Sequence, residues 1–211
     1  MKGEFIVLRR VRGGDVDLVA TLYGIYGKLT LFLKEGYLNE NPLFGVFEPF
    51  NVVDIDFYQS GNIIIPNDVR KVRRFSYKAK DYEQFIYMSK ISEAVLKFVH
   101  SYDEKIYKLL FNELEKKVKN LNTSLLRFYI NLIEILGYTP KFLYEGKIGQ
   151  KVKINLENGE IGSGNYEIKG SYIKLLRKIK NTKDYERIRI TKGSFKEIEK
   201  FLRDFLNYHT K

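Results

Sequence analysis

The period of the apolar residues changes near residue 81, and this change constrains the fold more than any other feature of the sequence. Before it, apolar residues recur at every second position, in short runs separated by glycine-containing turns. After it, they recur at every third or fourth position. A period of two indicates half-buried strands, whereas a period near 3.6 indicates amphipathic helices. The sequence therefore predicts an α+β protein, with a β domain over residues 1–80 and a helical domain over residues 81–211.

The β domain is predicted to be a small barrel. Its strand-like segments cover about 4–12, 16–23, 28–34, 44–58, 63–65 and 69–77. The Gly61-Asn62 pair predicts the turn before the fifth segment, and Pro66 is expected to break that segment. Short strands with turns at regular intervals favour a Greek-key barrel. An OB-fold is the first choice, and an SH3-like barrel is the alternative.

The helical domain is predicted from apolar stripes and from the residues that begin and end them. The first stripe contains Phe85, Met88, Ile91, Val95, Phe98 and Val99. Ser101-x-x-Glu104 and Ser194-x-x-Glu197 match the capping-box signature, so each is expected to begin a helix. Gly137 is expected to end the third helix, and Ser171 is expected to cap a short helix after it.

Residues 141–170 interrupt the helical pattern. They gain glycine and regain a period of two, with alternation around Val152, Ile154 and Leu156 and a hairpin turn predicted at Asn158-Gly159. The sequence therefore predicts a small β insertion, free of cysteine, within the helical domain.

Composition narrows the classes of function. The chain has no cysteine, which excludes disulfides, thiolate zinc sites and cysteine nucleophiles. It contains no GxxxxGK[ST], GxSxG, HExxH or GxGxxG motif. His100 and His209 lie at predicted helix ends, where the macrodipole favours them. Asp15 and Asp17 could form a carboxylate pair for a nuclease, but a turn cap or a bond to basic groups is the preferred interpretation. No enzymatic activity, cofactor or metal is predicted.

The sequence also predicts the compartment. No apolar run approaches the roughly 18 residues that span a bilayer. The amino terminus leads directly into a strand-like run and lacks the apolar core of a signal peptide. A cytoplasmic protein without a membrane partner is therefore expected.

The positive charge is unevenly distributed. Residues 1–80 hold 12 cations and 9 anions, residues 81–140 hold 8 of each, and residues 141–211 hold 17 and 9. An excess of this kind, here a net charge of +11, favours nucleic acid, an anionic surface or an acidic peptide as the partner. A lysine-rich proteome is the alternative explanation.

One run carries the strongest binding signal. Arg70 to Lys80 holds six cations, two aromatic residues and no anion in eleven residues. Cations neutralise phosphates, and aromatic rings stack bases without selecting a sequence. A solvated linker is the alternative, and solvated surface is the preferred interpretation of a similar cluster over 174–183. Phosphate contacts are predicted for Arg9, Arg10, Arg12, Lys28, Lys34, Arg70, Lys71, Arg73 and Arg74, with Tyr26 and Tyr37 as stacking platforms.

The order of several short motifs resembles the RecO family of bacterial recombination mediators. The motifs are Ile6-Val7-Leu8-Arg9, Gly14-Asp15-x-Asp17, Gly27-Lys28, Lys34-x-Gly36, Phe47-x-Pro49-Phe50, Leu125 to Phe128, Leu136-Gly137-Tyr138-x-Pro140 and Tyr208-His209. The resemblance covers nearly the full length. It implies an amino-terminal OB-fold, a helical domain and a role in recombinational repair at the nucleoid.

The resemblance also implies partners. Members of the family bind single- and double-stranded DNA, anneal complementary strands and associate with RecR. They engage the acidic tail of single-stranded DNA-binding protein (SSB) and so help RecA to load. By this resemblance, an apolar pocket in the helical domain is expected to bind that tail, with Arg127, Lys141 and Arg203 at its rim.

The sequence departs from the family pattern in two places. Many relatives carry a four-cysteine zinc module that residues 141–170 lack, so this segment is interpreted as a zinc-less remnant. The loop over 37–42 has no cation, where relatives often have a basic loop. The alternative function is an RNA- or ribosome-associated OB-fold protein with a binding or chaperone role.

Overall fold

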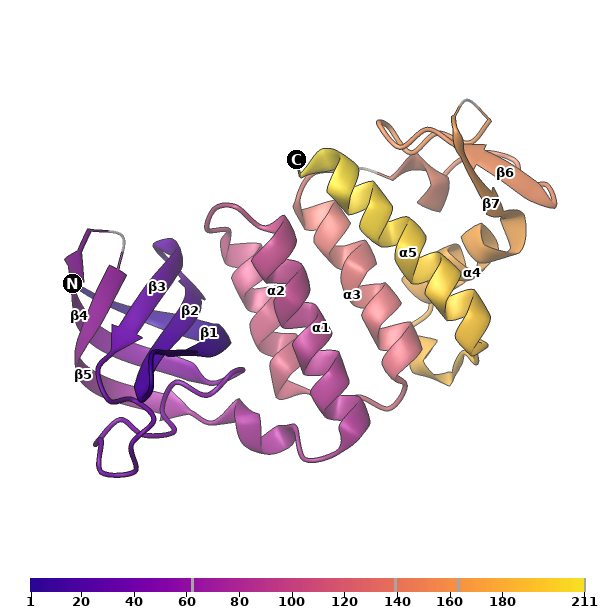
Figure 1. The fold of residues 1–211 in the computed structure, drawn as a ribbon. Coiled ribbons are helices and arrows are strands. Elements are labelled where there is room, and N and C mark those ends of the chain that lie inside the picture. The colour runs from indigo at the N-terminus through magenta and orange to yellow at the C-terminus, as the bar shows by residue number, and fades with distance from the viewer. Residues whose placement is uncertain (62, 139, 163, 211) are drawn as a thin grey trace. The chain divides into compact units, whose positions relative to one another are not determined.

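The computed structural model describes residues 1–61, 63–138, 140–162 and 164–210 (Figure 1). The chain divides into two compact units, Met1–Lys117 and Val118–Lys211. The first unit contains a closed β-barrel and helices α1 and α2, and the second contains helices α3 to α5 and a small sheet. The predicted α+β fold is confirmed. Asn62, in the predicted Gly61-Asn62 turn, lies outside the described residues.

The barrel has the strand order of an OB-fold. Its strands are β1 (Lys2–Gly13), β2 (Asp17–Gly24), β3 (Gly27–Leu33), β4 (Val52–Ser60) and β5 (Ile63–Arg73). Around the barrel they follow the order β1-β2-β3-β5-β4, and β1 and β4 also pair. β3 and β5 are parallel, and the other neighbours are antiparallel. The OB-fold prediction is therefore confirmed over the SH3-like alternative.

Strict alternation builds the barrel core, because alternate side chains of a strand point to opposite faces. Leu18, Ala20 and Leu22 of β2 are buried inside the barrel. The other strands contribute Phe5, Val7, Leu31, Val53, Ile55, Phe57 and Ile64.

Two strand predictions are wrong in part. Residues 44–51 were expected to begin the fourth strand, but they fold back as turns in which Gly45 and Phe50 have positive φ. The segments over 63–65 and 69–77 are one strand as far as Arg73, because a register shift opposite Phe57 accommodates Pro66 within β5. After Arg73 the chain forms a short 3-10 helix, Phe75–Lys78.

Helices α1 (Tyr82–Phe98) and α2 (Glu104–Glu115) begin at aspartates. The Asp81 carboxylate accepts a hydrogen bond from the Gln84 backbone N–H at 2.8 Å. Asp103 accepts hydrogen bonds from the two backbone N–H groups of Lys105 and Ile106, at 2.7 and 3.2 Å. The capping box predicted at Ser101 is therefore wrong, because the residue that satisfies the first free N–H groups of α2 is Asp103.

The apolar face of α1 also differs from the predicted stripe. Tyr87, Met88, Ile91, Val95 and Phe98 are buried. Phe85 was expected in the same face, but its side chain is 47% exposed. The buried face of α1 is therefore narrower than its apolar face, because not every apolar residue of this helix is covered by the barrel and α2.

In the second unit, α3 (Leu121–Ile135) packs against α4 (Gly170–Asn181) and α5 (Lys192–His209) (Figure 1). Gly137, with φ 85°, ends α3 as predicted. Thr191 caps α5 by accepting a hydrogen bond from the Ser194 backbone N–H at 3.2 Å, so the capping box predicted at Ser194 is wrong. Ser171 lies inside the first turn of α4 and does not cap it.

Strands β6 (Lys151–Ile154) and β7 (Tyr166–Lys169) form the predicted β insertion. The Asn158-Gly159 turn closes a smaller loop than expected, because Ile154 forms an isolated bridge with Ile161. A short 3-10 helix, Lys141–Leu143, precedes the insertion, and α4 follows it. A second short 3-10 helix, Tyr185–Arg187, follows α4.

Candidate nucleic-acid interface

The connection between β3 and β4, residues 34–51, is tied to the start of β2. The Asp17 carboxylate accepts a hydrogen bond from the Glu35 backbone N–H at 2.8 Å, and Glu35 has a positive φ of 55°. The Tyr37 backbone N–H donates to the carbonyl of Val16 at 2.9 Å. These bonds fix where Tyr37 lies, and they give Asp17 the turn-capping role that the sequence favoured.

Two of the predicted cations contact the ring of Tyr37. The guanidinium carbons of Arg10 and Arg12 each lie 5.1 Å from the centre of the Tyr37 ring. Arg10 and Arg12 are two residues apart on β1, so their side chains leave the strand on the same face. Cation–π contacts of this length are favourable. The Tyr37 ring therefore positions the guanidinium groups of Arg10 and Arg12 through cation–π contacts.

Two further cations lie around the same connection. Lys34 directly follows Leu33, which pairs with Leu18, and Leu18 pairs with Arg12. An N–H of the Arg74 guanidinium donates to the carbonyl of Gly45, at 3.4 Å. We call Arg10, Arg12, Lys34, Tyr37 and Arg74 the connection cluster.

The cations of the connection cluster differ in how far they are neutralised. Arg10 forms an ion pair of 2.5 Å with Glu48. Among the described residues, neither Arg12 nor Lys34 has an acidic partner within ion-pair distance, and both side chains are exposed. Arg74 is also exposed and, among the described residues, has no acidic partner within ion-pair distance. Arg12, Lys34 and Arg74 therefore carry most of the positive charge that the connection cluster offers to a polyanion.

The cations of β5 lie in a different environment. Arg70 is paired with Asp54, and its Nε lies 3.4 Å from a carboxylate oxygen of Asp56. Arg73 lies 3.9 Å from the Glu4 carboxylate and 5.1 Å from the centre of the Phe111 ring. Two of the six cations in the Arg70–Lys80 run, Arg70 and Arg73, are thus paired with acidic residues of neighbouring strands.

Lys71 and Tyr107 are two further polar residues beside the β5 cations. Lys71 is exposed and faces Asp54 in the strand register. Tyr107 of α2 donates a hydrogen bond of 2.7 Å to Glu4, and burial together with this bond raises the pKa of the Tyr107 hydroxyl. The Glu4 carboxylate therefore connects β1 both to Arg73 and to helix α2.

Lys28 and Tyr26 lie at the opposite end of the β2–β3 hairpin. The Lys28 ammonium group donates a hydrogen bond of 2.8 Å to the carbonyl of Leu96 in α1, and burial lowers its pKa. Phe5 stacks on Tyr26, with 6.2 Å between the ring centres, and the Tyr26 hydroxyl donates to the carbonyl of Lys2. Lys34 lies six positions after Lys28, which corresponds to about 20 Å along an extended strand. Lys28 and Tyr26 are therefore outside the connection cluster.

The three residues predicted at the rim of a tail-binding pocket lie on different elements. The Arg127 guanidinium donates to the carbonyls of Ile179 and Lys180 at the end of α4. Lys141 forms an ion pair of 2.5 Å with Glu160, which raises the pKa of Lys141. Arg203 lies on α5 and is half-buried. Arg127 thus has a structural role as the cap of α4.

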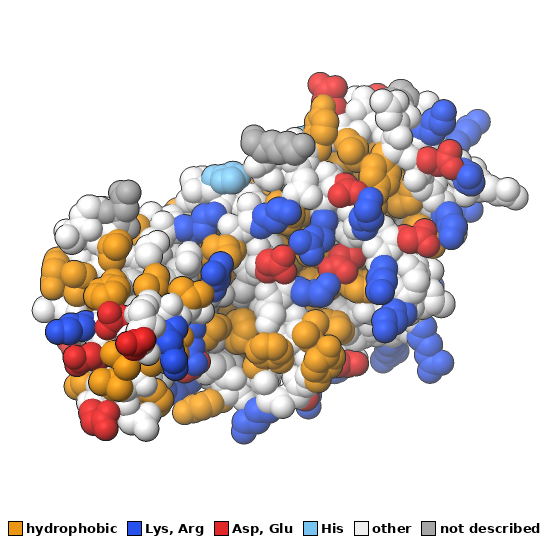
Figure 2. All heavy atoms as spheres, in the orientation of Figure 1, with side chains coloured by type: hydrophobic (Ala, Val, Ile, Leu, Met, Phe, Trp, Pro, Cys, Tyr) orange, Lys and Arg blue, Asp and Glu red, His pale blue; other side chains and the backbone are white. Residues whose placement is uncertain are grey.

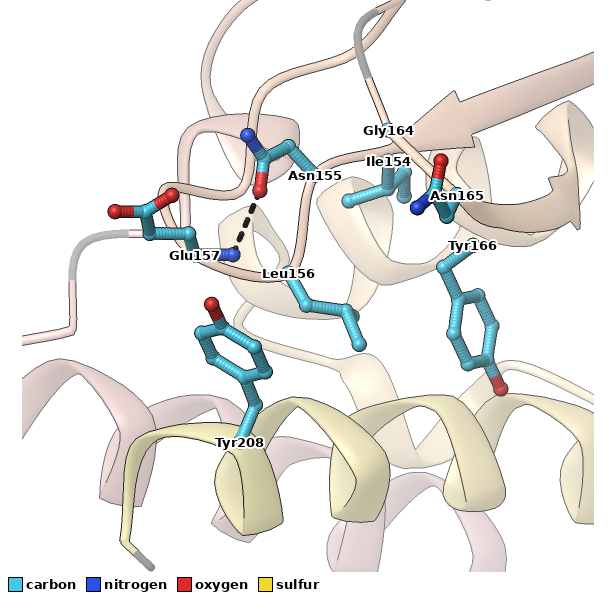
Figure 3. A pocket seen from close by; sticks show the side chains of 8 residues that line it. All are labelled: Ile154, Asn155, Leu156, Glu157, Gly164, Asn165, Tyr166 and Tyr208. Carbon is cyan, nitrogen blue, oxygen red and sulfur yellow. Dashed lines mark hydrogen bonds between the residues drawn. The ribbon is translucent and has the colours of Figure 1, made fainter.

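A pocket of about 340 Å³ in the second unit lies between the loop after β6 and the end of α5. Figure 3 shows the side chains of Leu156, Tyr166 and Tyr208 along its wall, with Glu157 at one end. Its lining residues include Glu157 and no lysine or arginine. The charge of this pocket therefore does not suit an acidic peptide.

The charges of the visible face are mixed. Figure 2 shows lysine and arginine side chains interspersed with acidic and hydrophobic ones, and they do not form a continuous stripe there. The sequence located the cations but missed their partners, since Glu4, Glu48, Asp54 and Asp56 come from other strands or loops. No local pattern in the sequence predicts these pairings.

A four-cysteine zinc site does not fit residues 141–170, the segment interpreted as a zinc-less remnant of such a module. The sequence contains no cysteine. Across the described residues, no three or more histidine, aspartate or glutamate side chains gather in an arrangement that could hold a metal ion. Aromatic packing lies in its place, since the ring centres of Phe142 and Phe201 are 5.0 Å apart and those of Tyr166 and Phe201 are 5.2 Å apart.

In the described part of the chain, no helix combines the length and the apolar character that a membrane span requires.

The fold and the connection cluster define a class: an OB-fold protein with a cationic barrel edge and a helical carboxy-terminal half. The family model described as "Recombination protein O C terminal" matches residues 79–211, which is more than half of the chain. The chain therefore belongs to the RecO family, and its role is in DNA repair and recombination.

Two of three similar curated proteins carry the RecO name. An uncharacterized protein of Aquifex aeolicus is 51% identical over 209 residues, which cover 99% of each chain. The DNA repair protein RecO of Thermodesulfovibrio yellowstonii is 29% identical over 232 residues, covering 96% of this chain and 90% of the relative. That of Caldanaerobacter subterraneus is 28% identical over 147 residues, covering 66% and 59%.

Proposed function

We propose that this protein is a recombination mediator that binds single- and double-stranded DNA through the connection cluster. The observation that carries the proposal is a pair of exposed cations, Arg12 and Lys34, at one edge of an OB barrel in a chain of the RecO family. Each cation that neutralises a phosphate releases condensed counterions. Such binding follows the sugar–phosphate chain and is independent of base sequence.

Annealing follows from the same chemistry. Two complementary strands repel each other, so a protein that neutralises phosphates while leaving the base edges free lowers the barrier to pairing. The proposed mechanism needs no bond breaking and no catalytic group. The Asp17 carboxylate, which a nuclease would require, accepts a hydrogen bond from the backbone instead. Magnesium-dependent cleavage that Asp15→Asn and Asp17→Asn abolish would contradict a non-enzymatic role.

We further propose a division of labour along the chain. Residues 1–80 form the DNA-binding domain, and residues 81–211, including the zinc-less remnant at 141–170, contact proteins at the nucleoid in the cytoplasm. The partners are RecR and the acidic tail of SSB, through which the protein helps RecA to load. Because Arg127 caps α4, Lys141 and Arg203 are the rim residues to test for tail binding.

The decisive experiment is annealing of fluorescently labelled complementary strands that SSB has coated. The protein is expected to accelerate annealing when SSB carries its acidic tail and to lose most of this effect when the tail is removed. No acceleration in either case would refute the mediator role. The alternative, an RNA-associated OB protein, predicts that structured RNA competes better than single-stranded DNA of equal length.

A further inference from the structure

A pocket in the first unit lies between β1, the Pro49-Phe50 turn and helix α1, and has a volume of about 330 Å³. This is within the range of roughly 300–1,000 Å³ that is typical of small-ligand sites. Its apolar lining includes Leu8, Phe50, Phe85 and Leu96, and its charged lining residues are Arg9, Arg10 and Glu93. Apart from Arg10, the lining residues are outside the connection cluster, and we call this pocket the Phe85 pocket.

The ring of Phe85 packs against one other ring and is only partly covered. Its centre lies 6.1 Å from that of Phe50, with an angle of 76° between the rings, so Phe50 meets it edge to face. Phe85 is 47% exposed, whereas Phe50 is only 5% exposed. Single exposed apolar side chains are common on protein surfaces, but this ring lines a concave and largely apolar pocket, which is the usual setting of a ligand site.

The wall formed by Phe50 is held rigidly. Phe50 has a positive φ of 77°, which is costly for a residue with a side chain. Its backbone N–H donates to Val7 at 2.8 Å, and the Val7 N–H donates to Asn51 at 2.9 Å. The buried Asn51 amide donates to Val46 at 3.0 Å and accepts from the Ser76 N–H at 3.1 Å. The strained turn is therefore over-determined by its neighbours, as at many functional sites.

The charges around the pocket select the ligand. Among the described residues, Arg9 has no acidic partner within ion-pair distance, whereas Arg10 is paired with Glu48. Glu93 also lines the pocket, so the anionic group of a ligand is expected to contact Arg9 and not to lie beside Glu93. A neutral flat ring with a phosphate on one side meets the apolar wall and Arg9 together. An unpaired nucleobase has this form, whereas the bases of a duplex have both faces covered by stacking.

We propose that the Phe85 pocket binds an unpaired nucleobase, which stacks on Phe85 while Arg9 contacts the adjoining phosphate. The inference rests on the proposed DNA-binding function and adds to it a preference for single strands. The connection cluster cannot supply this preference, because phosphates are present on both forms of DNA. Sequence reasoning had assigned stacking to Tyr26 and Tyr37, which are engaged by Phe5 and by two guanidinium groups respectively.

The test compares substitutions at Phe85 in the full chain by fluorescence anisotropy, with single-stranded and duplex oligonucleotides of equal length. Phe85→Ala and Phe85→Leu are expected to weaken single-strand binding about ten-fold, the size of one base–aromatic stacking contact, and to leave duplex binding unchanged. Phe85→Tyr should retain wild-type affinity, because tyrosine keeps the ring face. A 2-aminopurine base in the single strand should report stacking with the wild type and lose that signal with Phe85→Leu.

Tyr82→Ala is the matched control, because Tyr82 is an exposed aromatic of the same helix that does not line the pocket. The inference is overturned if Tyr82→Ala weakens single-strand binding as much as Phe85→Ala, or if Phe85→Leu binds like the wild type. It is also overturned if Phe85→Ala weakens both forms of DNA equally, or weakens only the binding of a labelled acidic peptide. If Phe85→Ala left single-strand binding unchanged while duplex binding still depended on Arg12 and Lys34, the base-binding pocket would be refuted and the proposed DNA-binding function would stand. A wild-type protein that binds neither form would refute the proposed function as well.

Discussion

The salt dependence of DNA binding distinguishes the cations that contact phosphates from those that neighbouring acids neutralise. Each phosphate contact contributes about 0.7 to the slope of log K against log salt concentration for single strands, and about 0.9 for duplex DNA. Replacing both Arg12 and Lys34 by alanine removes two exposed cations that have no acidic partner among the described residues. The slope should therefore become less steep by about 1.4 on single strands and about 1.8 on duplex DNA.

A slope change of that size is easy to measure. For a ten-fold rise in salt, single-strand binding by the wild type should weaken about 25-fold more than binding by the Arg12→Ala/Lys34→Ala variant. The assay is fluorescence anisotropy with a labelled oligonucleotide of fixed length, repeated between low and moderate salt. Circular dichroism and thermal melting verify that both proteins remain folded.

The matched control is Arg70→Ala together with Arg73→Ala. It removes the same net charge from the same barrel, but these cations pair with Asp54, Asp56 and Glu4. Their removal should leave the slope nearly unchanged. If the control flattened the slope as much as the Arg12/Lys34 variant did, the DNA path would follow β5, as the sequence alone suggested, and our placement of the interface would be wrong.

Three further predictions concern the second unit and its metal-free packing. Phe142→Ala should destabilise the protein by about 3–5 kcal/mol in urea unfolding, because this fully buried ring packs on two others, whereas a chelator should leave the melting temperature of the wild type unchanged. Thr191→Ala should cost about 1 kcal/mol by removing the cap of α5, whereas Ser194→Ala should cost clearly less, and equal losses would contradict the assignment of the cap. Burial between aromatic rings lowers the pKa of His209, so the unfolded chain binds this proton at a higher pH than the folded chain does. The free energy of unfolding should therefore decrease as the pH falls from above about 6.5, the ordinary histidine pKa, through the lower pKa of the folded state. In thermal melts, His209→Phe should lose this part of the pH dependence.

Much of the fold followed from local sequence patterns. Alternating residues such as Leu18, Ala20 and Leu22 predicted β2 and its buried face, and Gly137 predicted the end of α3. Helix starts were located to within a few residues, but the capping residue was misidentified at Ser101 and Ser194. A capping-box motif names a candidate acceptor, whereas the start of the helix selects the residue whose oxygen reaches the free N–H groups.

The sequence by itself determined the class of fold, the change from strands to helices and the excess of positive charge. The period of the apolar residues and the composition can both be read from neighbouring positions in the chain, without knowledge of distant contacts. Only the tertiary structure decided which cations remain available. Arg70 and Arg12 look equivalent in the sequence, yet closure of the barrel places Asp54 and Asp56 beside Arg70, whereas no acidic residue in the described part of the chain lies within ion-pair distance of Arg12. Likewise, the turn at Phe50 and the packing of α1 leave Phe85 exposed within an apolar stripe. Charge compensation and exposure depend on residues far apart in the chain, and for that reason the pattern of the sequence did not contain them.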